Sequence, residues 1–182
     1  HPENAGIAVN ERGAIVVDKR LHTTADNIWA MGDVTGGLQF TYISLDDYRI
    51  VRDELLGEGK RSTDDRKNVP YSVFMTPPLS RVGMTEEQAR ESGADIQVVT
   101  LPVAAIPRAR VMNDTRGVLK AIVDNKTQRM LGASLLCVDS HEMINIVKMV
   151  MDAGLPYSIL RDQIFTHPSM SESLNDLFSL VK

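Results

Sequence analysis

The sequence lacks the features that define several classes of protein. It contains a single cysteine, Cys137, among 182 residues, which excludes an intrachain disulfide. No apolar run approaches the roughly 20 residues of a membrane-spanning helix, and no secretory signal is visible. Lys and Arg are dispersed and the formal net charge is −4, so nothing supports nucleic-acid binding. These absences lead us to expect a soluble, cytoplasmic protein with no membrane or nucleic-acid partner.

Residues suited to nucleophilic or metal chemistry are also few. Cys137 lies in Leu131–Val138, which has the pattern of a buried strand, and free cysteines are commonly buried. We therefore expect an inert core thiol. His141 and Glu142 fit the polar first turn of a helix, and no ligand pair in the chain has metal-site spacing. The sequence predicts no metal site.

Apolar periodicity and turn residues predict the elements of the first part of the chain. Short strands are expected over Ile7–Asn10, Ala14–Asp18 and Ile28–Met31. A helix over Thr41–Leu56 should end at Gly57. Its buried face is predicted from the residues near helical spacing, which are Ile43, Ser44, Tyr48, Val51 and Leu55.

A domain boundary is predicted in Gly57–Asn68, which contains no apolar side chain. We expect one domain over residues 1–66 and another over 67–182. The second should contain the strands Tyr71–Met75, Ile96–Val103, Val118–Asp124 and Met130–Val138. Its helices are expected after Thr85, over Ser140–Ala153 and Tyr157–Gln163, and from about Ser169. The predicted class is α+β, an antiparallel sheet with helices on one face, preceded by the remnant of an α/β domain.

The last stretch of the chain places a histidine, His167, five residues before a carboxylate, Glu172. Histidine titrates near neutral pH, and a carboxylate on one ring nitrogen sets the tautomer at the other. With Pro168 restricting the backbone between them, the pair indicates a general acid/base and its orienting group. Ser169-x-x-Glu172 is also the spacing of a capping box. On that alternative, Glu172 caps the last helix and His167 is a surface residue.

Two motifs in the chain resemble those of the pyridine nucleotide–disulfide oxidoreductases, a flavin-dependent family that includes glutathione reductase and dihydrolipoamide dehydrogenase. Residues 165–172 resemble the His-Pro-(Thr/Ser)-x-x-Glu signature at the end of these enzymes. Residues 23–33 resemble their second flavin fingerprint, in which a Thr precedes a short buried strand ending in Gly-Asp. The region between reads as the family's interface domain, so the resemblance covers essentially the whole chain.

The resemblance implies a flavin site in the first part of the chain. Asp33 would accept a hydrogen bond from the ribityl hydroxyls of FAD, and Gly32 would allow close approach of the backbone. Phe40 and Thr41 would lie at the start of the following helix, whose amino terminus favours the electron-rich end of the ring. The family usually has Thr-Pro where this chain has Thr41-Tyr42.

The resemblance also implies a catalytic role for the C-terminal pair and a homodimer. His167 would accept and return the proton of the thiol that attacks the acceptor, and Glu172 would hold the imidazole. The redox cysteines would lie on the other subunit, which makes dimerisation a condition for catalysis. The Thr76-Pro77 and His167-Pro168 bonds occupy places where the family often has cis prolines.

Parts that such an enzyme needs are missing from this sequence. It has no G-x-G-x-x-G phosphate loop for FAD or for NAD(P)H, and no cysteine pair. It also begins at His1 without an initiator Met. We therefore expect the C-terminal part of a longer NAD(P)H-dependent flavoprotein. FAD and NAD(P)H would belong to the full-length protein, and the isolated fragment would bind neither and be inactive.

The sequence is compatible with three functions of the full-length protein. The first is reduction of a small-molecule or disulfide acceptor through the cysteine pair. A second is a flavin reductase acting on a metal ion, with copper or mercury as candidates. Mercuric reductases usually have a tyrosine where His167 stands, which argues mildly against that branch. The third is a dimerisation module with no retained chemistry.

Overall fold

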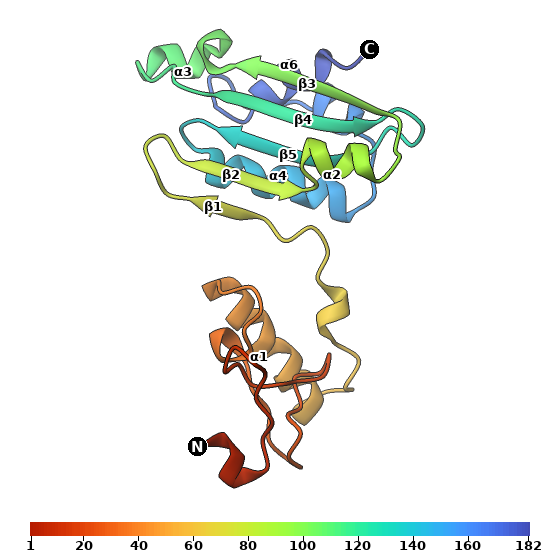
Figure 1. Cartoon of the computed structure of the whole chain (residues 1–182). Coiled ribbons are helices and arrows are strands. Elements are labelled where there is room, and N and C mark those ends of the chain that lie inside the picture. The colour runs from red at the N-terminus through yellow and green to blue at the C-terminus, as the bar shows by residue number, and fades with distance from the viewer. The chain divides into compact units, whose positions relative to one another are not determined.

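The chain forms two compact parts in a computed structural model that describes residues 1–182 (Figure 1). We call His1–Lys67 unit 1 and Asn68–Lys182 unit 2. No helix in the chain has both the length and the apolar character needed to cross a membrane.

Unit 1 is built around one long helix, α1 (Thr41–Leu56), as predicted. Three short 3₁₀ turns accompany it, η1 (Pro2–Ala5), η2 (Gly32–Thr35) and η3 (Thr63–Asp65). The helix ends at Gly57, whose N–H donates to the carbonyl oxygen of Asp53.

The predicted buried face of α1 was wrong in part. Its buried residues are Ile43, Asp47 and Ile50, whereas Tyr48 and Leu55 are exposed. Hydropathy misplaced the face because Asp47 is paired with an arginine, and a paired carboxylate can be buried.

The strands predicted in unit 1 were also wrong. The structure has no strand there, only two isolated antiparallel bridges, Val9 with Ile15 and His22 with Trp29. A strand needs a ladder of hydrogen bonds along a neighbour, and these segments share only single pairs. Asp33 therefore follows an extended segment rather than a strand at the edge of a sheet.

Unit 2 contains one antiparallel sheet of five strands, which confirms the α+β prediction. The strands are β1 (Tyr71–Val73), β2 (Leu79–Gly83), β3 (Ile96–Pro102), β4 (Val118–Asp124) and β5 (Met130–Leu136), in the spatial order β1-β2-β5-β4-β3. The sequence did not predict β2, because Ser80 and Arg81 interrupt its apolar residues. Ser80 is nevertheless buried, and its hydroxyl is bonded to those of Ser72 and Ser140.

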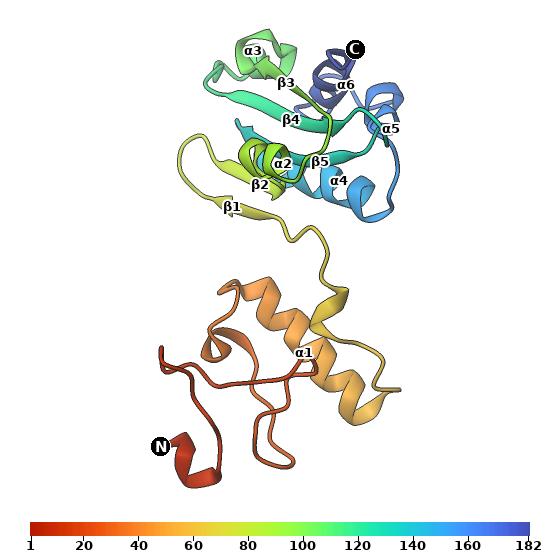
Figure 2. The same cartoon turned by 45° about the vertical axis from the view of Figure 1, so that its right-hand side comes forward.

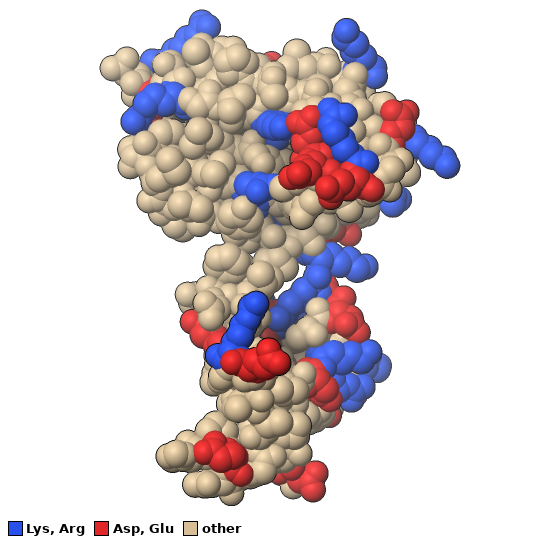
Figure 3. Space-filling model, viewed as in Figure 1, with Lys and Arg blue, Asp and Glu red and all other residues tan.

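Three helices, α4 (Ser140–Asp152), α5 (Ser158–Asp162) and α6 (Ser173–Ser179), cover one face of the sheet (Figures 1 and 2). The short α2 (Glu86–Glu91), capped by Thr85 as predicted, lies over the opposite face. Charged side chains of both signs gather there (Figure 3), with Lys120 contacting Glu86 at 2.5 Å. The remaining helix, α3 (Pro107–Val111), follows β3.

The core of unit 2 lies between the sheet and the three covering helices. On β4, Leu119, Ala121 and Val123 occupy alternate positions and are fully buried, as the twofold period of a strand requires for one face of the sheet. The covering helices contribute several of the largest buried side chains, among them Met143, Ile144, Leu174, Leu177 and Phe178.

We predict that Phe178→Ala lowers the stability of unit 2 by about 3–5 kcal/mol, because it leaves a cavity in a core that cannot fully collapse. Urea unfolding followed by far-UV circular dichroism is the appropriate measurement, since unit 2 holds all the strands. The matched control is Leu180→Ala, an exposed position directly after α6, which should change stability by less than about 0.5 kcal/mol. Equal effects of the two substitutions would contradict the packing described.

Candidate functional site

His167 and Glu172 form a direct contact. The imidazole Nδ1 lies 2.8 Å from Oε2 and 3.1 Å from Oε1 of the carboxylate. The side chain of His167 is 70% exposed, whereas that of Glu172 is only 15% exposed. An ionised carboxylate only accepts hydrogen bonds, so Nδ1–H donates to it. With Nδ1–H as the donor, Nε2 is the proton acceptor of the neutral form of this exposed ring.

The pair is held by the packing of α6. Leu174 and Phe178 anchor this helix in the core, and Glu172 immediately precedes its first residue. The side-chain amide of Asn175 donates to the carbonyl oxygens of Leu160 and Gln163 at 2.7 and 3.0 Å. These bonds attach the segment before His167 to α6. The backbone that carries His167 and the backbone that carries Glu172 are therefore held to each other.

Only one of the two hydrogen bonds of a Ser169–Glu172 capping box is present. The Glu172 N–H donates to Ser169 Oγ at 3.2 Å, but the Glu172 carboxylate faces His167 instead of returning to the backbone of Ser169. The helix predicted from about Ser169 begins at Ser173, because residues 169–172 form the turn that brings Glu172 back toward the ring.

The remaining candidates for nucleophilic or metal chemistry lie elsewhere. Cys137 is fully buried, with its Sγ 3.9 Å from Met143 Sδ. Burial, with a smaller effect of Asp139, raises the pKa of its thiol to about 12. His141 contacts the ring of Phe74, and no group of three or more His, Cys, Asp or Glu side chains is placed to hold a metal ion. The X-Pro bonds at Pro77 and Pro168 are both cis, as predicted.

A second candidate site lies at the Gly32–Thr35 turn of unit 1. Gly32 has φ +76°, and a Cβ on it would lie 3.0 Å from Ser44 Oγ on α1. Glycine is therefore required both by the backbone and by the close approach of the helix. The turn is closed by Thr35 Oγ1, which donates to the Gly32 carbonyl oxygen, and by the Gly36 N–H, which donates to that of Asp33.

The residues predicted to meet a flavin lie on this turn and at the start of α1, where Asp33 and Thr41 are exposed and Phe40 is half-buried. Asp33 is exposed, and its carboxylate makes no hydrogen bond or ion pair within the chain. Phe40 and Tyr42 stack with ring centroids 5.1 Å apart. Thr41 begins α1, and no side chain caps this helix end. An accessible carboxylate, a close backbone and an open helix amino terminus suit a polyhydroxylated, electron-rich ligand.

An ion-pair network beside this turn was not predicted. Asp47 is 2% exposed; it accepts a hydrogen bond from the Gly32 N–H at 2.7 Å and forms an ion pair with Arg66. Arg66 also donates to Asp46 at 2.8 Å, and Arg61 to Asp46 at 2.9 Å. A signal existed in the sequence: Asp47 falls between Ile43 and Ile50 on one helical stripe, where a carboxylate needs a buried partner.

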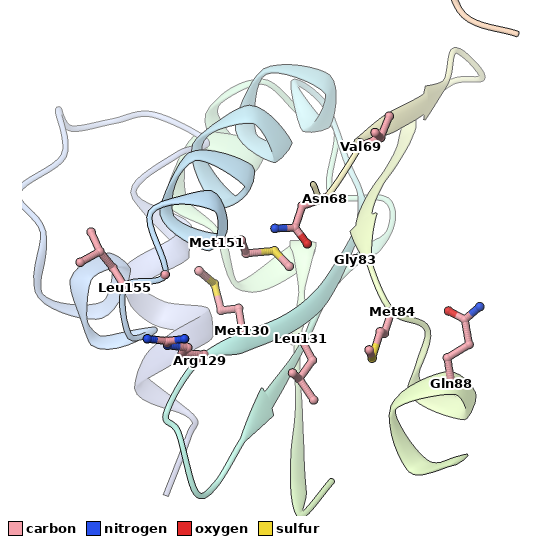
Figure 4. Close-up of a pocket in the computed structure, with 11 residues that line it drawn as sticks. Asn68, Val69, Gly83, Met84, Gln88, Arg129, Met130, Leu131, Met151 and Leu155 are labelled. Atoms are coloured by element: carbon pink, nitrogen blue, oxygen red, sulfur yellow. The ribbon is translucent and has the colours of Figure 1, made fainter. Parts of the chain in front are cut away.

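A pocket of about 560 Å³ lies in unit 2 (Figure 4). Arg129 is its only charged lining residue, so it holds no acid/base pair, and it contains none of the predicted site residues. The lining consists of Asn68, Val69, Gly83, Met84, Gln88, Arg129, Met130, Leu131, Met151, Gly154 and Leu155.

Comparison with known proteins identifies both units. Residues 69–178 match the dimerisation domain of pyridine nucleotide-disulphide oxidoreductases, and residues 1–47 match the pyridine nucleotide-disulphide oxidoreductase model. A mercuric reductase of Staphylococcus aureus is 36% identical over 94% of this chain and 31% of its own length. A dihydrolipoyl dehydrogenase of Mycobacterium tuberculosis is 31% identical over 97% of this chain and 38% of its own length.

A solved structure is nearly identical to this chain. The HOCl-induced flavoprotein disulfide reductase RclA of Escherichia coli matches with a TM-score of 0.99 and 99% identity, over 100% of this chain and 42% of that one. A Cu(II) complex of the same reductase matches equally well. The string Gly36–Asp47 predicts a resemblance to the bacterial reactive-chlorine-resistance flavoprotein, and this prediction is confirmed. The chain spans less than half the length of these relatives.

We predict a pH-dependent contribution of Asp46 to the stability of unit 1. Burial would raise the pKa of Asp46, but Arg66 and Arg61 outweigh it and hold the pKa below its ordinary value of 3.8. A carboxyl whose folded pKa is depressed stabilises the fold above its unfolded pKa and loses that contribution as pH falls through the folded pKa. Asp46→Asn should therefore cost about 1–3 kcal/mol at neutral pH and progressively less below about pH 4.

The fluorescence of Trp29, the only tryptophan in the chain, reports unfolding of unit 1. Asp64→Asn is the control, since Asp64 pairs with Lys19 on the exposed surface, where ion pairs contribute little. A stability difference between Asp46→Asn and the unmodified chain that stays constant from neutral to acid pH would contradict the assignment.

Proposed function

Because the chain belongs to the pyridine nucleotide-disulphide oxidoreductase family, we propose that it is the C-terminal part of an FAD-dependent NAD(P)H oxidoreductase. In this proposal the full-length protein reduces its acceptor through a redox cysteine pair outside this chain. Unit 2 supplies the dimer interface and the acid/base. The observation that carries the proposal is the contact between Nδ1 of His167 and Glu172 at 2.8 Å, with the ring exposed.

In the proposed reaction His167 handles the proton of the attacking thiol. Its Nε2 takes the proton as the thiolate forms and returns it when the reduced acceptor leaves. Glu172 keeps Nδ1 protonated, orients the ring and stabilises its charged form. Because the only cysteine of this chain, Cys137, is fully buried, the thiol has to come from another subunit or another part of the protein. In a symmetric homodimer, each subunit can supply the thiol to the other through the same interface.

The residues that would hold FAD are those of the turn in unit 1. Asp33 would accept from the ribityl hydroxyls, Gly32 would let the backbone approach, and Phe40 and Thr41 would lie beside the ring. When bound, FAD supplies two-electron chemistry between the nicotinamide and the cysteine pair. The exposed Asp33 carboxylate and the uncapped start of α1 support this assignment.

Exposed apolar side chains on unit 2 support the proposed homodimer. Ile164 is 92% exposed three residues before His167, and Phe74 and Met75 project from the β1–β2 loop. Figure 3 shows few charged side chains around that loop. Apolar surface of this kind is uncommon on monomers and marks an interface.

Metal-ion reduction is the second candidate function. Mercuric reductases are among the relatives, and one matching structure is a Cu(II) complex. In that case the metal ion is the substrate, and the cysteine pair outside this chain would be the soft ligand that binds it. The isolated chain would then bind and reduce no metal ion.

We predict that His167→Ala in the full-length protein slows acceptor reduction by about a hundred- to ten-thousandfold, while reduction of the flavin by NAD(P)H changes little. The imidazole handles the thiol proton and takes no part in hydride transfer. Glu172→Gln should cost less, since the ring remains and only its orientation and charge stabilisation weaken. Stopped-flow measurement separates the two half-reactions.

The matched control for this experiment is Glu142→Gln, an exposed carboxylate on α4, which should leave both half-reactions unchanged. Equal slowing of both half-reactions by His167→Ala would indicate a structural role at the interface. No effect on either would leave Glu172 as a residue of the turn before α6. A panel of disulfides and of copper and mercury salts as acceptors distinguishes the two candidate functions.

We predict that the chain self-associates into a symmetric dimer through Tyr71–Lys182. Ile164→Asp should weaken association by at least about tenfold, because it places a charge at a buried apolar contact. Leu56→Asp, an equally exposed position in unit 1, is the control and should leave association unchanged. Sedimentation equilibrium measures both. Only monomer in the unmodified chain at micromolar concentrations would count against the interface.

A further inference from the structure

The turn that carries Asp33 is fixed by a carboxylate that does not face the solvent. Asp47 Oδ2 accepts the Gly32 N–H at 2.7 Å, and the Asp47 residue is 2% exposed. Gly32 is simultaneously packed against Ser44 on the same helix. The position and direction of the Gly32–Asp33 peptide are therefore set by α1, one residue before the side chain proposed to meet the flavin.

Asp47 depends in turn on Arg66. A buried carboxylate is costly unless it is paired and its oxygens accept hydrogen bonds. Arg66, whose side chain is 17% exposed, contacts the second oxygen of Asp47 and donates through Nε to Asp46 at 2.8 Å. The two Asp47 oxygens are thus divided, one to the turn and one to the arginine. Removing Arg66 would leave one buried Asp47 oxygen without its ion pair, and removing the Asp47 carboxylate would leave the Gly32 N–H without its acceptor.

Arg66 is itself placed by the segment that follows α1. The side chain of Asp53 accepts the N–H groups of Lys60 and Arg61 at 2.8 and 2.9 Å. Ser62 and Asp65 form a reciprocal capping box around η3, directly before Arg66. The segment is therefore folded back on α1, and its arginine reaches Asp46 and Asp47 from a fixed backbone.

A role in stability alone does not account for this arrangement. Replacing a buried ion pair by apolar residues is often neutral or stabilising, and Ile43 and Ile50 already provide apolar packing on the same stripe. The charged pair adds a defined orientation of the turn, because the Asp47 carboxylate holds the N–H of Gly32. That N–H belongs to the turn whose exposed Asp33 has no partner among the other side chains.

We propose that Asp47 and Arg66 are positioning residues for the flavin site, in which Arg66 orients the Asp47 carboxylate and Asp47 holds the Gly32–Asp33 turn where Asp33 meets the ribityl chain. This inference rests on the proposed function. It makes flavin affinity depend on the segment of residues 61–66, which contains no residue of the flavin motif.

The test measures the Kd of FAD for the full-length apoprotein by fluorescence titration, together with the visible absorbance band of the bound flavin. Asp47→Leu removes the acceptor and should weaken FAD by about ten- to a hundredfold, with a shifted absorbance band. Asp47→Asn keeps one oxygen for the Gly32 N–H but turns an amide NH2 toward Arg66, so it should weaken FAD less than Asp47→Leu does. Lys19→Met, which breaks the exposed pair with Asp64, is the control and should change neither readout.

Arg66 variants test the second link without removing the acceptor. Arg66→Met should weaken FAD by at least about fivefold, and Arg66→Lys should recover part of the loss because it restores a charge but not the two-pronged geometry. If Asp47→Leu does not fold, the comparison of Arg66→Met with Arg66→Lys tests the proposal in its place. Unmodified affinity and spectrum in both Arg66 variants, or in a folded Asp47→Leu protein, overturn the proposal.

Asp33→Ala separates this inference from the proposed function. If Asp33→Ala weakens FAD but the Asp47 and Arg66 variants do not, the positioning role alone is wrong. If Asp33→Ala also leaves FAD affinity unchanged, the assignment of this turn to the flavin is wrong. Loss of affinity in all three, with thermal unfolding of the apoprotein unchanged in Arg66→Lys, supports the proposal.

Discussion

Burial of one face of the five-stranded sheet holds the rest of unit 2 in place. Leu119, Ala121 and Val123 on β4 lie under the covering helices, and α6 buries Phe178 completely in the same core. Because Glu172 immediately precedes α6, packing of the core also sets where its carboxylate lies. The polar contact with His167 is thus a consequence of apolar packing, which contributes most of the free energy of folding.

Unit 1 reaches order by a different route. It has no sheet and few buried apolar residues, namely Leu21, Ala30, Ile43 and Ile50. Its turns are held instead by hydrogen bonds and ion pairs, several of them to Asp46, Asp47 and Asp53 of α1. Apolar residues could often replace such pairs without loss of stability, but removing one partner is costly, and the pairs specify direction closely. A segment organised in this way suits a role in which one backbone turn has to be placed accurately.

Prediction from sequence succeeded where the signal was local. The helix Thr41–Leu56, the capping box at Thr85 and the strand Val118–Asp124 were all predicted from spacing and turn residues and are all present. Prediction failed for Ile28–Met31 and for β2. Whether an extended segment becomes a strand depends on a partner distant in sequence, and a β2 with buried Ser80 depends on the hydroxyl of Ser140.

The sequence by itself determined the candidate pairs, because His167 and Glu172, like Gly32 and Asp33, are close neighbours whose chemistry follows from residue type and spacing. Only the tertiary structure decided what these residues face. It directed the Glu172 carboxylate to the imidazole instead of the helix backbone, and it brought Arg66 to Asp47 across a gap of 19 residues in sequence. The physical reason is that burial of a carboxylate depends on its partners, and partners are chosen by how the chain folds back.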